Sequence, residues 1–291
     1  MGKNQLEQLK EMTTVVADTG EFEQIKQYKP QEATTNPSLI LAAAKNSTYH
    51  PLIKEVLQKA KERGGKKKEI LSYALDLMCV RFGIEILQIV PGRVSTEIDA
   101  RLSFDSKKSI QKAREIIEMY EKAGVKKERI LIKLASTFEG IKTAAILEKE
   151  GIHCNMTLIF SLAQSIRAAL AKVTLISPFV GRILDWYSKK EGKSSYPAAE
   201  DPGVVSVKEI YSYFKKFNYP TQIMGASFRN VGEIQELAGC DLLTIAPTLL
   251  EKLSQDYSPL VRKLSAQEAA KQKIKKQNMQ EKQFRWALCQ H

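Results

Sequence analysis

Apolar and polar residues alternate along the chain in blocks that predict a regular succession of strands and helices. Short runs rich in β-branched residues predict strands at 14–18, 32–35, 93–97, 129–134, 153–157, 173–177, 221–226 and 241–245. Amphipathic stretches between most of them predict helices at 51–63, 69–90, 106–123, 138–150, 161–171, 206–217, 230–238 and 248–255. The stretch 188–202 is rich in Lys, Glu, Ser and Gly without apolar periodicity, and we expect a mobile loop there.

This alternation indicates an α/β protein with a parallel sheet. Eight strands within about 240 residues favour a closed (β/α)8 barrel of the TIM type over an open doubly wound sheet. A chain of 291 residues with 43% hydrophobic content can bury one such core. We therefore expect an extra N-terminal helix and a barrel within residues 1–258, followed by a basic, partly helical tail over residues 259–291.

Charge and composition exclude several classes of protein. Half of the net charge of +12 lies from Arg262 onward, where eight Lys or Arg face two acids. Such a tail can contact nucleic acid, but it lacks the interleaved aromatics of single-strand binders, so nucleic acid is not a favoured partner. No apolar run approaches the roughly 18 residues of a membrane span, and the start lacks a secretory signal. The four cysteines and three histidines show no ligand or disulfide spacing, so we expect reduced thiols, no metal and a cytoplasmic location.

The predicted strand at 129–134 places a lysine inside the barrel. Side chains alternate along a strand, and the more apolar face should meet the helices, which turns Lys133 into the lumen. Burial disfavours the ammonium form, so a lysine there is either held in a salt bridge or used chemically. Only a neutral amine attacks a carbonyl to form a Schiff base. Taken alone, Lys133 leaves the structural and the catalytic interpretation open.

The same parity places polar groups from several strands at one mouth of the barrel. These inward groups are Asp18, Glu97, Asn155, Thr157 and Ser177, with Phe179 in phase after its strand. A lumen is normally filled by branched apolar side chains, so this convergence favours a functional site. Arg182 and Arg229 follow strand ends, and forked guanidinium groups suit a phosphate dianion. We expect Arg229 to open a helix, where free N–H groups also favour anions. No P-loop or G-x-G-x-x-G run is present.

Six ordered motifs carry a resemblance to a known family. The chain resembles the class I transaldolases of the pentose phosphate pathway over about residues 5–255, through TTVVADTG (13–20), ATTNPSLI (33–40), PGRVSTE (91–97), RILIKLAS (129–136), ISPFVGRILDW (176–186) and MGASFR (224–229). The resemblance implies a homodimer without cofactor. It also implies transfer of dihydroxyacetone from sedoheptulose 7-phosphate to glyceraldehyde 3-phosphate, which gives erythrose 4-phosphate and fructose 6-phosphate.

The resemblance also implies a role for each matching residue. Lys133 would form the Schiff base, Asp18 would take the proton from the donor's C4 hydroxyl, and Glu97 with Thr157 would move protons through a water. The dihydroxyacetone hydroxyls would be held by Thr34, Asn36, Asn155 and Ser177. The phosphate would be gripped by Arg182, Ser227 and Arg229, while the ring of Phe179 would keep water from the imine.

The chain departs from the family pattern in three places. Family members carry a Gly-containing small-residue segment before the sixth strand, whereas this chain reads RAALAKV at 167–173, so we expect strain at Lys172 in the turn that positions Ser177. Phe138 stands where Trp is common. Transaldolases of this type continue beyond the segment matching 284–286 into another long C-terminal helix, which we expect this chain to lack.

Three other interpretations stay open at this point. The chain could be a shortened, non-catalytic transaldolase-like isoform or scaffold. A nucleic-acid role could rest on the basic tail. Within enzymes, a sugar-phosphate aldolase that releases dihydroxyacetone would use the same lysine.

Overall fold

The computed structural model describes residues 2–290 and contains eight parallel strands that close into a barrel. Each strand pairs with its neighbours in sequence, and β8 closes onto β1. The predicted (β/α)8 barrel is therefore confirmed. The strands are β1 Thr14–Asp18, β2 Glu32–Thr34, β3 Val94–Glu97, β4 Ile130–Ala135, β5 Cys154–Ile159, β6 Leu175–Pro178, β7 Gln222–Gly225 and β8 Leu242–Ile245.

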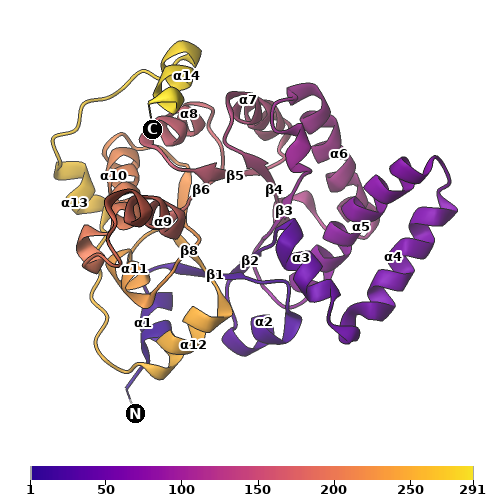
Figure 1. Cartoon of the computed structure of the whole chain (residues 1–291), viewed down its shortest axis with the longest axis horizontal. Coiled ribbons are helices and arrows are strands. Elements are labelled where there is room, and N and C mark those ends of the chain that lie inside the picture. The colour runs from indigo at the N-terminus through magenta and orange to yellow at the C-terminus, as the bar shows by residue number, and fades with distance from the viewer. Residues whose placement is uncertain (1, 291) are drawn as a thin grey trace.

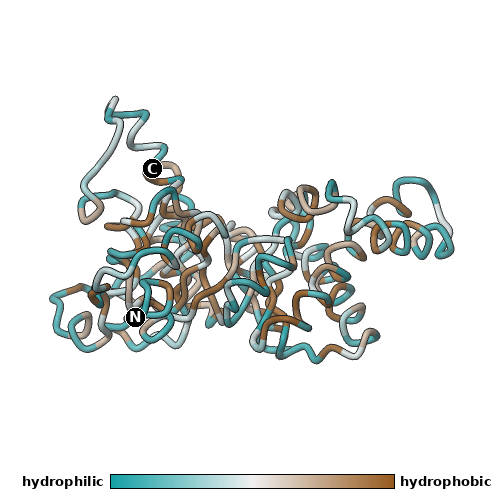
Figure 2. The backbone as a smooth tube through the Cα atoms, turned by 90° about the horizontal axis from the view of Figure 1, so that it is seen from below, coloured by the Kyte–Doolittle hydropathy of each residue, from teal (hydrophilic) through white to brown (hydrophobic). Residues whose placement is uncertain are grey.

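Helices surround the ring of strands (Figure 1). They are α1 Gln5–Lys10, α2 Phe22–Tyr28, α3 Pro37–Ala44, α4 His50–Glu62, α5 Lys67–Leu87, α6 Ser106–Lys122, α7 Phe138–Leu147, α8 Leu162–Leu170, α9 Val180–Glu191, α10 Pro202–Lys216, α11 Val231–Glu236, α12 Pro247–Gln255, α13 Ala266–Lys271 and α14 Glu281–Cys289. The α4–α5 pair projects from one side of the barrel in both views (Figures 1 and 2). No described helix is long and apolar enough to cross a membrane.

The strand positions agree with the sequence prediction to within two residues, but several helices were not predicted. The missing ones are α2, α3 and α9, of which α3 begins at Pro37 behind the N-cap Asn36. The expected loop at 188–202 is wrong in part, because 188–191 complete α9 and a 3-10 turn covers Ala198–Glu200. Asp201 then caps α10, accepting hydrogen bonds from the N–H groups of Gly203 and Val204. The predicted helix at 138–150 ends as α7 at Leu147 and continues as a 3-10 turn.

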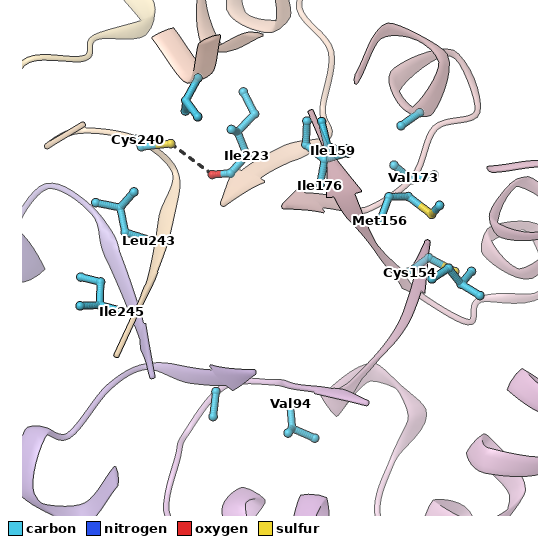
Figure 3. Packing of buried hydrophobic residues seen from close by; sticks show 14 of the residues in the cluster. Val94, Cys154, Met156, Ile159, Val173, Ile176, Ile223, Cys240, Leu243 and Ile245 are labelled. Atoms are coloured by element: carbon cyan, nitrogen blue, oxygen red, sulfur yellow. Dashed lines mark hydrogen bonds between the residues drawn. The ribbon is translucent and has the colours of Figure 1, made fainter. Parts of the chain in front are cut away.

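Outward-facing side chains of the strands form the main core with the helices. Figure 3 shows this layer, with side chains such as Val94, Met156 and Leu243 pointing away from the ring of strands. A second, smaller cluster fills the lumen and comprises Val16, Leu131, Leu175, Met224 and Leu242. At the N-terminal ends of the strands, the guanidinium of Arg93 donates to Glu32 at 2.6 Å and to Gln222 at 2.8 Å. These two layers close the lower half of the barrel.

The C-terminal segment packs along the outside of the barrel, with α13 against α10 and α14 against α7 and α8. Phe284 of α14 is fully buried, and its ring centroid lies 5.7 Å from that of Phe138. The guanidinium groups of Arg167 and Arg285 lie 5.3 and 5.0 Å from the centroid of the Phe138 ring. The ring of Phe138 in α7 therefore packs against side chains of both α8 and α14.

The turn between α8 and β6 is strained where the sequence predicted strain. Lys172 has a φ of +58°, in the left-handed region that costs a residue with a Cβ atom about 1–2 kcal/mol. Two residues separate this turn from β6, which begins at Leu175 and carries Ser177.

Candidate active site

Lys133 points into the barrel from the middle of β4 and is 7% exposed. Its Nζ atom lies 3.0 Å from the Oε2 atom of Glu97 on the neighbouring strand β3 and 3.3 Å from the carbonyl oxygen of Thr35. The parallel register pairs Glu97 with Lys133, so the two strands hold the ion pair side by side. The amine is thus buried with one carboxylate partner, and its position is fixed by rigid strands rather than loops.

Asp18 ends β1 on the same face of the barrel. The Thr34 hydroxyl donates to its Oδ1 atom at 3.1 Å and lies 2.7 Å from the hydroxyl of Thr244. Burial raises the pKa of Asp18, against the nearby Lys133 cation and the Thr34 hydrogen bond, which lower it. A carboxylate whose pKa is raised binds a proton more readily, which is the property that a general base requires.

A cavity of about 170 Å³ opens at the C-terminal ends of the strands. Its lining is Asp18, Thr34, Asn36, Lys133, Thr157, Ser177, Phe179, Arg182, Met224, Ala226, Ser227 and Thr244. All the residues predicted for the site from the sequence line it, except Glu97, Asn155 and Arg229. A larger hollow of about 610 Å³ at the opposite end of the barrel, lined by residues such as Lys10 and Arg262, contains none of the predicted residues.

Three predicted residues lie beside or outside the cavity. Glu97 contacts Lys133 from a second, smaller cavity lined also by Leu158. Asn155 is fully buried below the cavity, where its amide donates to Ser95 at 3.0 Å and its Oδ1 atom accepts from Ser177 at 2.6 Å.

Arg229 does not turn into the cavity. Its guanidinium pairs with Asp185 of α9 at 2.7 Å. It also does not open α11 directly, since Asn230 is the N-cap of that helix. The backbone N–H of Arg229 instead donates to Glu233 at 2.6 Å.

The polar lining has one unsatisfied group. Within the described residues, the buried hydroxyl of Thr157 has no hydrogen-bond partner. Across the mouth, the guanidinium of Arg182 lies 5.4 Å from the ring centroid of Phe179, and that ring packs edge-on against Phe160 at 5.7 Å. A buried hydroxyl without a partner, facing a polar cavity, is suited to a bound water or a substrate oxygen.

Sequence reasoning missed Thr244, Met224 and Ala226 in the cavity lining. The signal for Thr244 was present, because Thr244 shares the inward parity of β8 with Leu242. Within residues 2–290, no cluster of His, Cys, Asp and Glu has the arrangement of a metal site. All four cysteines are free thiols, and burial raises the pKa of Cys240 to about 12.

The chain has clear relatives among known proteins. The sequence model of the family described as Transaldolase/Fructose-6-phosphate aldolase matches residues 15–291. A transaldolase of Thermosynechococcus vestitus is 58% identical over 285 residues, which span 97% of this chain and 73% of that protein. A probable transaldolase of Drosophila melanogaster is 58% identical over 97% of this chain and 86% of its own length.

A transaldolase of Bos taurus is 57% identical over 98% of this chain and 85% of that protein. The chain therefore belongs to the transaldolase/fructose-6-phosphate aldolase family, and within it to the transaldolases, which are transferases.

Proposed function

We propose that this transaldolase moves a dihydroxyacetone unit between sugar phosphates through a Schiff base on Lys133. The donor is sedoheptulose 7-phosphate and the acceptor is glyceraldehyde 3-phosphate, as in the family that the sequence resembles. The observation that carries the proposal is the meeting of three groups. The Lys133 amine lies 3.0 Å from Glu97, and the cavity that Lys133 lines is lined also by Asp18. An amine, a base and a proton carrier are what the chemistry needs.

The reaction begins when the Lys133 amine, as its neutral form, attacks the C2 carbonyl carbon of the donor. The carbinolamine loses water and leaves a protonated imine. Asp18 then takes the proton from the C4 hydroxyl, the C3–C4 bond breaks, and its electron pair moves into the imine to give an enamine. The aldehyde product leaves. The enamine carbon attacks the acceptor aldehyde, Asp18 returns the proton to the new alkoxide, and hydrolysis releases the ketose.

Glu97 and Thr157 handle the protons of carbinolamine formation and dehydration. Glu97 contacts the Lys133 amine directly, and the unpartnered hydroxyl of Thr157 supports a water between them. In this role, the water delivers a proton to the departing hydroxyl and returns as the nucleophile when the imine is hydrolysed.

Substrate binding divides between the two ends of the cavity. Thr34, Asn36 and Ser177 hold the dihydroxyacetone hydroxyls near Lys133, and Asn155 orients Ser177 through the 2.6 Å hydrogen bond. At the mouth, Arg182 and Ser227 bind the phosphate, joined by Arg229 once its guanidinium leaves Asp185. Phe179 covers the imine with an apolar ring and limits its hydrolysis.

Covalent trapping tests this proposal. Incubation with fructose 6-phosphate and borohydride should reduce the imine to a stable adduct on the peptide that contains Lys133, detected by mass spectrometry. Lys112 is an internal control, because it is partly buried too but is paired with Asp76 and Glu115 outside the barrel. An unmodified Lys133 in a folded, substrate-treated sample contradicts the proposal.

The related aldolase reaction is separated by its product. An enzyme that transfers its three-carbon unit forms fructose 6-phosphate from sedoheptulose 7-phosphate and glyceraldehyde 3-phosphate without accumulating free dihydroxyacetone. Stoichiometric release of dihydroxyacetone in the presence of acceptor would favour the aldolase instead.

We also propose a homodimer in the cytoplasm. The dimer rests on the family resemblance, and the four free thiols are consistent with a reducing compartment. Light scattering coupled to size-exclusion chromatography checks the dimer, and a monomer at micromolar concentration would refute it.

A further inference from the structure

Strand β5 contains an irregularity next to the proposed active site. Its pairing with β6 shifts register between Met156 and Ile159, so that one extra residue is accommodated there. Leu158 within this stretch has a φ of +58°, a left-handed backbone that a residue with a branched side chain rarely adopts. This bulge immediately follows Thr157, and bulges that redirect side chains are common beside active sites.

Gln164 on α8 holds both sides of the bulge through its side-chain amide. Its Nε2 atom donates to the carbonyl of Leu158 at 3.0 Å and to the carbonyl of Ser136 at 3.1 Å. Its Oε1 atom accepts the backbone N–H of Phe160 at 2.9 Å and the hydroxyl of Ser161 at 3.4 Å. Gln164 is only 7% exposed, so these hydrogen bonds are shielded from water and losing them is costly.

The residue that follows β4, Ser136, also hydrogen-bonds to the bulged part of β5. Both the backbone N–H and the hydroxyl of Ser136 donate to the carbonyl of Thr157, at 2.8 and 2.7 Å. Gln164 therefore joins the end of β4 to the bulge of β5, with Thr157 in between. The carbonyl oxygen of Thr157 is therefore hydrogen-bonded, whereas its hydroxyl has no partner among the described residues and faces the cavity.

The bulge decides which side chains face the cavity. In an uninterrupted strand, Thr157 and Ile159 would share the inward face. Because of the extra residue, Ile159 is instead fully buried in the outer core, beside Ile176 (Figure 3), while Thr157 remains inward. Without the bulge, either Ile159 enters the cavity or the register slips and turns Thr157 away from it.

We propose that Gln164 is a positioning residue for the reaction, which stabilises the left-handed backbone at Leu158 and thereby aims the Thr157 hydroxyl at the space beside Lys133 and Glu97. This inference rests on the proposed role of Thr157 in proton transfer. The Gln164 side chain does not line the cavity, so it would act on the reaction only by fixing the position of Thr157.

The test uses Gln164→Met, which keeps the volume of the side chain but removes all four of its hydrogen bonds. We expect the rate of borohydride-trappable imine formation to fall about 100-fold, the lower end of the roughly 10²- to 10⁴-fold that a positioned proton-transfer group contributes. Thr157→Val should cause a similar loss, and the double variant should lose no more than about threefold beyond either single one, because the two changes disable one device.

Rescue separates positioning from general loss of structure. Glycine adopts a φ of +58° without steric cost, so Leu158→Gly introduced into Gln164→Met should recover about tenfold of the lost rate. Gln5→Met is the matched control, since Gln5 is a buried amide that hydrogen-bonds Ser258 and Gln235 on the far side of the barrel. This control should lower Tm comparably and leave the rate of imine formation unchanged.

The outcomes keep the two proposals distinct. If Thr157→Val is impaired but Gln164→Met reacts within twofold of the wild type, or if their losses multiply, or if Leu158→Gly gives no recovery, the role of Gln164 is refuted. If Thr157→Val itself forms the imine normally, the proposed role of Thr157 fails, and the role of Gln164 fails with it. Should Gln164→Met not fold, Gln164→Glu serves as the second variant. It keeps the acceptor for Phe160 but loses the donor for both carbonyls, so the same loss and rescue are expected.

Discussion

Replacing Glu233 with glutamine should remove a buried proton held beside the proposed phosphate-binding loop. Glu233 and Asp201 are 0% and 2% exposed, and each accepts backbone hydrogen bonds at the start of its helix. The Oε1 atom of Glu233 has no donor among the described residues, although the two carboxyl groups interact. We expect the pair to share one proton, because two buried carboxylates cannot both be charged at low cost.

The size of the effect follows from the pKa. Burial, and secondly the charge of Asp201, raise the pKa of Glu233 from 4.5 to about 7. Between these values the folded protein binds more protons than the unfolded chain, so the free energy of unfolding falls as pH rises through this window. Between about pH 5.5 and pH 8 the fall from this group is about 2 kcal/mol, at 1.36 kcal/mol per pKa unit. Glutamine keeps the acceptor and carries a permanent donor, so Glu233→Gln should not show it.

Urea unfolding of both proteins at the two pH values measures the prediction. Burial also raises the pKa of Asp18 and of Asp76, so the difference between wild type and variant is needed to isolate the titration of the Glu233–Asp201 pair. We expect the variant to gain about 2 kcal/mol relative to wild type on going from pH 5.5 to pH 8. Glu236→Gln on the same helix is the control, because Lys208 and Lys263 hold the pKa of Glu236 below its ordinary value in spite of burial. A constant difference between wild type and Glu233→Gln across this range would refute the shared proton.

Three further changes test separate features of the molecule. Lys172→Gly should raise the free energy of unfolding by about 0.5–1 kcal/mol, since the left-handed backbone then costs nothing but the unfolded chain gains entropy; unchanged or lower stability in urea would contradict this. Asp185→Asn should lower KM for glyceraldehyde 3-phosphate about two- to fivefold by freeing Arg229 from a surface ion pair, with no change for unphosphorylated glyceraldehyde, and equal effects on both acceptors would count against it. Phe284→Ala should destabilise the protein by about 3–5 kcal/mol, because the ring is fully buried against Phe138; a loss below about 1 kcal/mol in thermal or urea unfolding would show that α14 does not contribute to the core.

The barrel was predictable because its strands have a strong local signal. Runs such as ILIKLA are short, apolar and rich in β-branched residues, which is typical of a strand buried on both faces, and the period of two along the run predicts that Lys133 faces the lumen. The helix α3 was missed for the opposite reason. Its sequence, PSLILAAA, is apolar on nearly every side, so its periodicity is weak even though Asn36 and Pro37 mark its start.

Parts of the site depend on contacts that are distant in sequence. The pairing of Arg229 with Asp185 joins residues 44 positions apart, and no local pattern predicts that a guanidinium after β7 turns toward α9. The bulge at Leu158 could not be predicted from the local sequence either, because leucine is not a residue that favours a left-handed backbone. Its cause is the amide of Gln164, six residues later, together with the burial of Ile159. Parity along a strand therefore finds inward residues only up to the first irregularity.

The closed N-terminal end of the barrel determines the order in which substrates bind and products leave. The apolar layer around Leu131 and the Arg93 cluster beneath it leave Lys133 reachable from one end only. While the first aldehyde product remains beside the Lys133 adduct, it blocks the path of the acceptor aldehyde to the enamine carbon. The first aldehyde has to leave through the same end of the barrel by which the acceptor enters. The two aldehydes should therefore compete for the enzyme in steady-state kinetics, because they cannot be bound at the same time.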